Sequence, residues 1–145
     1  MRHASLSIFA AAALALAAPV AADAASVMGQ WLSPDGLAKA RVESCGAGVC
    51  GTIVWLKRPT DPATGRPVID THNPDPAQRA RPIVGMKFLS GFRPDGDNRW
   101  TGGHIYDPKS GKTYDSKLSL DGKGDLKLEG CVGPFCQAQI WTPAG

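Results

Sequence analysis

The chain has 145 residues, of which 43% are apolar and 20% are charged, and its formal net charge at pH 7 is +3. This length is enough for one domain with one hydrophobic core. Basic and acidic residues are interspersed, and no basic run is longer than Lys57-Arg58. The sequence therefore lacks the clustered basic face of a nucleic-acid-binding protein, and we expect no nucleic acid among its partners.

The first 24 residues have the organisation of a signal peptide. The positively charged start Met1-Arg2-His3 precedes an apolar run over residues 6–18, which is too short to span a bilayer comfortably. The triplet Ala22-Asp23-Ala24 matches the small-residue pattern of a cleavage site. We expect cleavage after Ala24, with Ala22 as the alternative, and one domain over residues 25–145. No later segment is apolar enough to insert into a membrane, so we expect a periplasmic or secreted protein.

Eight short segments of alternating apolar and polar residues follow, separated by turn-forming residues. The alternation is strictest over residues 112–120, where Tyr114 and Leu118 share one face and Asp115 takes the other. This period of two is typical of half-buried strands, and short strands at regular spacing indicate an all-β fold. Eight strands in a meander predict an up-and-down antiparallel barrel, because closure removes the sheet edges. The predicted strands are residues 27–32, 37–45, 50–57, 82–92, 99–106, 112–120, 125–131 and 136–142.

The four cysteines form two closely spaced pairs, Cys45 with Cys50 and Cys131 with Cys136. An even number of cysteines in an exported chain indicates disulfides, although four cysteines allow three pairings. Each pair flanks a four-residue turn, and residues that face each other across a hairpin have suitable separations for a bridge. We therefore expect two local disulfides, with a zinc site or a crossed pairing as the alternatives.

Residues 58–81 form one long connection that contains five prolines. A connection of this length is usually a functional or a disordered loop, so it is either a solvated loop or a lid over a ligand. Successive turns of a meander barrel alternate between its two ends. The connection should therefore share one end with the turn at residues 107–111, and we expect Arg81 to grip Asp107 there at two points.

Candidate ligand-binding residues follow from this placement. Tyr106 and Tyr114 flank the turn at residues 107–111, and on one face they would line the rim of a pocket. Trp55 and Trp100 could lie deeper, although such aromatic residues are more often plain core. The candidates are Asp70, His72, Asn73, Arg81, His104, Tyr106, Asp107, Tyr114, Trp55 and Trp100.

Metal and covalent chemistry have weak support in the sequence. His72 and His104, together with Asp70 and Asp107, have the side-chain types of a metal site but no ligand spacing. No Gly-x-Ser-x-Gly motif is present. We expect no metal, no cofactor and no enzymatic activity, with acid–base catalysis by Asp107 and His104 as the alternative.

The triplet Gly29-Gln30-Trp31 looks like the Gly-x-Trp signature of lipocalins. Together with DTHNPDPAQRARPIVGM at residues 70–86 and GGHIYDPKSGKTYDSKLSL at residues 102–120, the chain resembles the bacterial exported proteins grouped as domain-of-unknown-function family 2147. The resemblance covers nearly all of residues 25–145 and implies a lipocalin-like (calycin) barrel of unassigned function. Lipocalin-type chains tend to place an Arg near the end of the last strand, against the signature tryptophan. This chain has none there, and Arg99 or Arg41 would have to replace it.

Three functions are compatible with these features. The first is an exported, monomeric carrier or sensor of a small, partly apolar ligand. The second is an envelope protein that binds another protein and has a filled barrel, and the third is a small acid–base enzyme. The interior of the barrel distinguishes the first two, because an open cavity lined by Trp and Tyr favours a ligand and a filled interior favours a protein partner.

Overall fold

The computed structural model describes residues 10–17 and 26–145. The predicted cleavage site and most of the predicted signal peptide lie outside the described residues. In the described part of the chain, no helix is long and apolar enough to cross a membrane.

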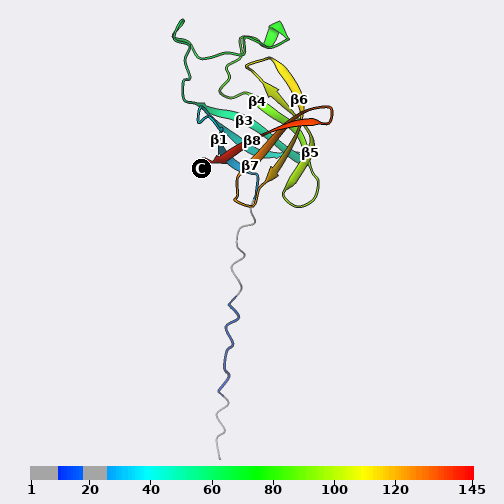
Figure 1. Ribbon diagram of the computed structural model, residues 1–145. Helices are drawn as coiled ribbons and strands as arrows, with labels where there is room; N and C mark the ends of the chain where they lie inside the picture. The colour runs from blue at the N-terminus through cyan, green and yellow to red at the C-terminus, as the bar shows by residue number, and fades with distance from the viewer. Residues whose placement is uncertain (1–9, 18–25) are drawn as a thin grey trace, which may run out of the picture.

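Eight antiparallel strands form a closed barrel in which each strand pairs with its neighbours in sequence, and β1 pairs with β8 (Figure 1). The prediction of an all-β, up-and-down barrel is confirmed. Ser116 and Leu118 are buried and Asp115 and Lys117 are exposed, as the alternation over residues 112–120 requires. The elements are β1 (Gly29–Leu32), β2 (Ala38–Cys45), β3 (Gly48–Leu56), the 3-10 helix η1 (Pro76–Gln78), β4 (Lys87–Pro94), β5 (Arg99–Asp107), β6 (Lys112–Leu120), β7 (Leu126–Val132) and β8 (Phe135–Pro143).

The fourth strand begins later than predicted, at Lys87 instead of residue 82. Residues 82–86 instead fold back on the preceding chain, where the backbone N–H of Ile83 donates to Val68 O at 3.0 Å and that of Gly85 to Ile53 O at 2.7 Å. Ile83 and Met86 are thereby buried in the core. The long connection consequently spans residues 57–86, which we call the lid segment.

Apolar side chains fill the centre of the barrel. Phe92 and Leu89 are fully buried, and glycines on neighbouring strands make room for them. A Cβ at Gly103 would lie 2.5 Å from the Phe92 ring, and a Cβ at Gly51 would lie 2.7 Å from Leu89. Large side chains thus interlock with glycines across the interior. The buried core comprises Val27, Trp31, Ala40, Val42, Val49, Ile53, Ile83, Met86, Phe88, Leu89, Phe92, Leu118, Leu126, Leu128 and Trp141.

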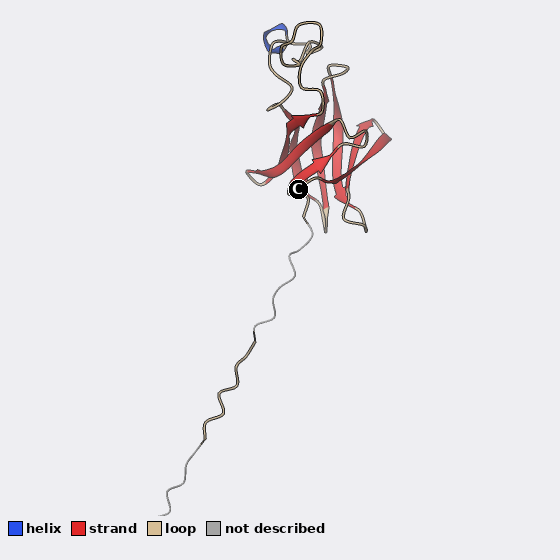
Figure 2. Cartoon of the chain, turned by 90° about the vertical axis from the view of Figure 1, so that its left-hand side faces the viewer, coloured by secondary structure: helices blue, strands red, loops and turns tan. Residues whose placement is uncertain are grey.

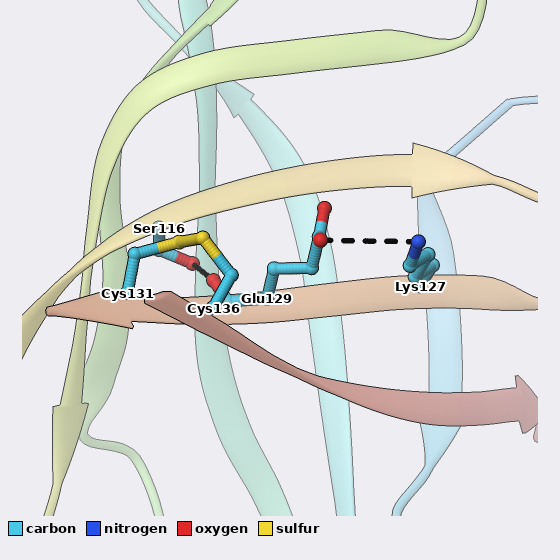
Figure 3. Close-up of a disulfide and its surroundings, with 5 residues drawn as sticks. All are labelled: Ser116, Lys127, Glu129, Cys131 and Cys136. Atoms are coloured by element: carbon cyan, nitrogen blue, oxygen red, sulfur yellow. Dashed lines mark hydrogen bonds and ion pairs between the residues drawn. A yellow bond between two sulfur atoms is a disulfide. The ribbon is translucent and has the colours of Figure 1, made fainter. Parts of the chain in front are cut away.

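Both predicted disulfides are present, Cys45–Cys50 and Cys131–Cys136, with Cα separations of 5.7 and 4.0 Å. The alternatives, a zinc site and a crossed pairing, are therefore wrong. Cys131 lies directly opposite Cys136, whereas Cys50 lies opposite Glu43 and is bridged diagonally. Figure 3 shows the second bridge beside Ser116, whose hydroxyl donates to the carbonyl of Glu129 at 2.6 Å.

Reduction of both disulfides should lower the stability of the barrel without unfolding it. Each bridge closes a loop of only a few residues, so each should contribute about 2 kcal/mol through the unfolded state. We expect the free energy of unfolding to fall by about 4 kcal/mol while the β-sheet circular dichroism of the reduced protein persists in water. Complete unfolding on mild reduction would contradict this prediction.

The indole N–H of the signature tryptophan, Trp31, has a backbone carbonyl as its hydrogen-bond acceptor. The indole N–H of Trp31 donates to Val27 O at 2.8 Å, and Val27 is itself fully buried. Arg99 lies 3.8 Å from Asp95 instead. The hydrogen bond of this tryptophan therefore needs no arginine from the last strand.

Candidate functional site

The lid segment lies at the barrel end that also carries the β1–β2 and β5–β6 turns (Figures 1 and 2). The carbonyl of His72 packs directly against Gly111, where a Cβ could not fit. Lys109 Nζ in the β5–β6 turn lies 4.0 Å from Asp35 Oδ2 in the β1–β2 turn. These contacts confirm the shared end that turn alternation predicted.

Asp70 is the centre of a hydrogen-bonded cluster that fastens the lid segment to β5. Its side chain is fully buried. The Tyr106 hydroxyl donates to Asp70 Oδ1 at 2.6 Å, while Asn73 Nδ2 and Arg81 Nε donate to Oδ2 at 2.8 and 2.9 Å. We call these four residues the lid latch. Because Tyr106 belongs to β5 and the others to the lid segment, the latch ties residues distant in sequence.

The latch perturbs the pKa values of two of its members. Burial raises the pKa of Asp70, but the hydrogen bonds from Asn73, Tyr106 and Arg81 outweigh it, so this pKa lies below the ordinary 3.8. Burial and the bond to the Asp70 carboxylate raise the pKa of Tyr106 from 10.0 to about 12. The folded latch therefore favours an ionised aspartate beside a neutral phenol.

The stability contribution of the latch should disappear at both extremes of pH. The lowered pKa of Asp70 gives a contribution that is present above pH 3.8 and is lost as the pH falls through the depressed value. The raised pKa of Tyr106 gives a contribution that is present below pH 10.0 and is lost as the pH rises towards about 12. Urea unfolding of the wild type and of Tyr106→Phe should therefore show stabilities that converge between pH 10 and 12. An unchanged difference over that interval would contradict the assignment.

The predicted pair between Arg81 and Asp107 is wrong, because Arg81 binds Asp70. The Asp107 carboxylate instead serves its own turn, where it accepts from the backbone N–H of Lys109 at 3.0 Å and from Ser110 Oγ at 2.9 Å. Arg81 also lies over the Tyr106 ring, with Cζ 5.5 Å from the centroid. An unpaired charge costs more free energy on a buried carboxylate than on a solvated carboxylate. This explains why Arg81 binds the buried Asp70 and not the half-buried Asp107.

Tyr106 and Tyr114 do not share a face, so the condition for a pocket rim of two phenols is not met. Tyr106 lies opposite Thr113 and Tyr114 lies opposite Ile105, and consecutive residues of a strand point to opposite faces. Tyr106 follows the outward-facing residue His104 by two positions, so it lies outside the barrel wall beneath the lid segment. The two phenols therefore cannot line one pocket.

The remaining candidates are dispersed. Trp55 is 39% exposed and Lys39 Nζ lies 5.0 Å from its ring centroid, on the outside of the wall. Trp100 packs against the core. His104 Nε2 lies 3.5 Å from Asp115 Oδ1, while Asp107 serves its turn, so the two proposed acid–base groups have different partners.

A surface hollow of about 280 Å³ lies between the lid segment and the outer faces of β4, β5 and β6. Four predicted candidates line it, namely Asn73, Arg81, His104 and Tyr106, and Asp70 lies buried beneath them. We call it the lid hollow. Its other lining residues are Pro74, Gln78, Lys87, Phe88, Ser90 and Thr113.

The sequence matches the family described as "Uncharacterized protein conserved in bacteria (DUF2147)" over residues 29–143. The chain belongs to this family. No curated protein sequence matches it. Protein HP1028 from Helicobacter pylori, described as belonging to the lipocalin family, is similar in structure, with a TM-score of 0.72 and 20% sequence identity over 84% of this chain and 85% of that chain. The predicted family and the lipocalin-like barrel are thus both confirmed.

Sequence reasoning missed Lys87 and Ser90 in this DUF2147 member, although strand alternation contains a signal for Ser90. Ser90 lies opposite His104 in the β4–β5 pair, so any outward site that includes His104 also includes Ser90. Lys87 could not be recognised as a site residue, because the predicted strand began at residue 82 and placed Lys87 in its middle instead of at its start. Among residues 10–17 and 26–145, no three His, Cys, Asp or Glu side chains gather in a way that could hold a metal.

Proposed function

We propose that this protein is an exported small-ligand-binding protein that holds its ligand in the lid hollow, outside the filled barrel. The observation that carries the proposal is the convergence of polar side chains from the lid segment, β4 and β5 on one hollow of about 280 Å³. Ligand sites combine a concave surface with a few polar groups of this kind. The two disulfides support export, because such bridges persist in oxidising compartments.

The charges of the hollow favour a ligand with an anionic group. Arg81 and Lys87 line it and His104 adds a third nitrogen base, while no lining residue is a carboxylate. Arg81 uses Nε for Asp70 and is 36% exposed, which leaves its terminal nitrogens available to a ligand. Tyr106 supplies ring surface for an apolar portion. The ligand is therefore a small, partly apolar molecule with a carboxylate or phosphate group.

Native mass spectrometry of protein purified from the cells that make it tests this proposal. We expect a fraction of the wild type to carry an additional small-molecule mass. The substitution Lys87→Gln should weaken retention about tenfold, because a charge-assisted hydrogen bond contributes about 1.5 kcal/mol. Lys117→Gln is the matched control, since Lys117 lines a separate hollow. A bound mass that both variants retain equally would place the ligand elsewhere.

The filled interior favours a second candidate, an envelope protein-interaction module. Phe92, Leu118 and Leu128 occupy the space in which a lipocalin-like barrel would hold an internal ligand. The large apolar side chains at the β7–β8 turn are exposed instead, with Phe135 at 80% and Val132 at 66%. A single-pass purification of crosslinked protein from the envelope would support this candidate if one partner is recovered in wild type and lost in Phe135→Ser.

A further inference from the structure

The outer edge of β8 is open along most of its length. β1 pairs with β8 only through Trp31 opposite Pro143 and Leu32 opposite Thr142. In the described residues no strand pairs with residues 135–141 on the side away from β7. Residues 135–140 are all exposed on both faces, and the turn of the β7–β8 hairpin projects at the right of Figure 1. The barrel is thus closed at one end of β8 and presents a free strand edge at the other.

The register identifies which backbone groups this edge presents. Val132 lies opposite Phe135 across a two-residue turn, and the residues that flank such a turn exchange hydrogen bonds with each other. Hydrogen-bonded pairs then recur at every second residue, so Cys136, Ala138 and Ile140 direct their N–H and C=O groups away from β7. The bond from Ala144 N to Gln30 O at 2.9 Å follows the same alternation towards β1.

The sequence of this edge is nearly symmetric about Ala138. Residues 135–141 are Phe-Cys-Gln-Ala-Gln-Ile-Trp, in which glutamines flank the alanine, apolar residues come next and aromatic residues stand at both ends. A two-fold axis at Ala138 would place Ala138 opposite itself, Gln137 opposite Gln139 and Phe135 opposite Trp141. The same axis places the outward-directed N–H and C=O groups of Cys136 opposite those of Ile140 in the second copy. Each free donor at this edge therefore faces a free acceptor.

This edge lacks the features that keep strand edges from pairing. No charged side chain follows Glu129, and no proline lies between Pro134 and Pro143. Monomeric proteins usually protect open edges with charges, prolines or bulges. Because the strand is uncharged, two copies can approach without opposing like charges.

We propose that two copies of this protein associate through antiparallel pairing of their β8 edges about a two-fold axis at Ala138. The contact is isologous, so it closes as a dimer and does not propagate. In this register the exposed Phe135 lies opposite Trp141 of the second copy, whose own ring is buried in its barrel, and the pairing extends each barrel wall by a strand. The sequence favoured a monomer, because the sequence alone does not show that β1 covers only two residues of β8.

Sedimentation equilibrium of the disulfide-intact protein over a range of concentrations tests the pairing. We expect the wild type to shift from monomer to dimer mass as concentration rises. Ala138→Lys and Ala138→Glu each place like charges directly opposite each other in the dimer but on an exposed surface in the monomer, so each should weaken association about tenfold or more. Ala138→Thr, which adds bulk but no charge, is the control and should still dimerise.

An equimolar mixture of the two charged variants, Ala138→Lys with Ala138→Glu, separates the proposal from misfolding. Opposite charges then face each other across the axis, so the mixture should regain the dimer mass that each variant lost alone. A wild type that stays monomeric at every concentration would overturn the proposal. The open edge of β8 would then be a site for pairing with a strand of a different protein. A dimer that both charged variants retain would overturn the β8 register.

Discussion

Phe92→Ala should lower the free energy of unfolding by about 3–5 kcal/mol, the largest effect that we expect from a single substitution. The Phe92 ring is fully buried, and it occupies the space above Gly103, where a Cβ would lie 2.5 Å away. A glycine cannot extend into the cavity that the substitution creates. The cost therefore includes both the lost apolar burial and the unfilled volume.

Urea unfolding measures this effect, and Phe135→Ala is the matched control. Phe135 is 80% exposed, so in dilute protein its truncation should change the stability by less than about 0.5 kcal/mol. A rescue tests the interlocking directly. Gly103→Ala alone should overpack the site and cost about 1–3 kcal/mol, whereas Gly103→Ala combined with Phe92→Leu should cost less than the sum of its parts. Strict additivity would show that the two residues do not share the space.

The strands could be predicted from the sequence because their signal is local. The alternation over residues 112–120 depends only on which face of one strand is buried, and β6 has these bounds. The start of β4 could not be predicted in this way. Residues 82–86 are an apolar run next to the strand, but their backbone bonds to Val68 and Ile53, and those partners become neighbours only after the lid segment has folded.

The end of the barrel at which the candidate residues lie was predicted better than their contacts. Turn alternation placed Asp70, Asn73 and Arg81 at the correct end of the barrel. The partner of Arg81 depended on which carboxylate is buried, and local sequence contains no such information. The faces of the two tyrosines depended on the register of the β5–β6 hairpin, in which a shift of one residue exchanges the faces. In the observed register Tyr106 lies opposite Thr113 and Tyr114 lies opposite Ile105, so the two tyrosines are on opposite faces.

The filled interior could not be inferred because it results from pairs of residues on different strands. Gly51 and Gly103 indicate weak points in a strand when each is considered alone. Opposite Leu89 and Phe92 they are instead the positions that allow dense packing. This packing moves the candidate ligand site from the inside of the barrel to its outer wall, and the lid latch is the structure that holds that outer site in place.

Asp70→Asn should therefore release the lid segment and lower the free energy of unfolding by about 3 kcal/mol. The carboxylate accepts three side-chain hydrogen bonds, two of them at 2.8 and 2.9 Å on Oδ2, and hydrogen bonds to a buried charged group contribute about 1.5–3 kcal/mol each in net terms. An amide at this position cannot accept all three, so at least one buried donor loses its partner. Hydrogen exchange at the backbone amides of residues 68–83 should accelerate, while exchange in β6 and β7 stays slow.

A phenol titration reports on the latch separately from stability. The chain has two tyrosines, so Tyr114→Phe leaves Tyr106 as the only phenol. In that background the ultraviolet absorbance of tyrosinate should appear with a pKa of about 12, and Asp70→Asn should lower this pKa, because the hydrogen bond and the negative charge that raise it are removed. Asp121→Asn is the control, since Asp121 bonds to its own β6–β7 turn and its charge does not act on Tyr106, so it should leave both the lid exchange and the titration nearly unchanged. If Asp70→Asn destabilised the barrel but left the Tyr106 titration at its original value, the two residues would not form the latch.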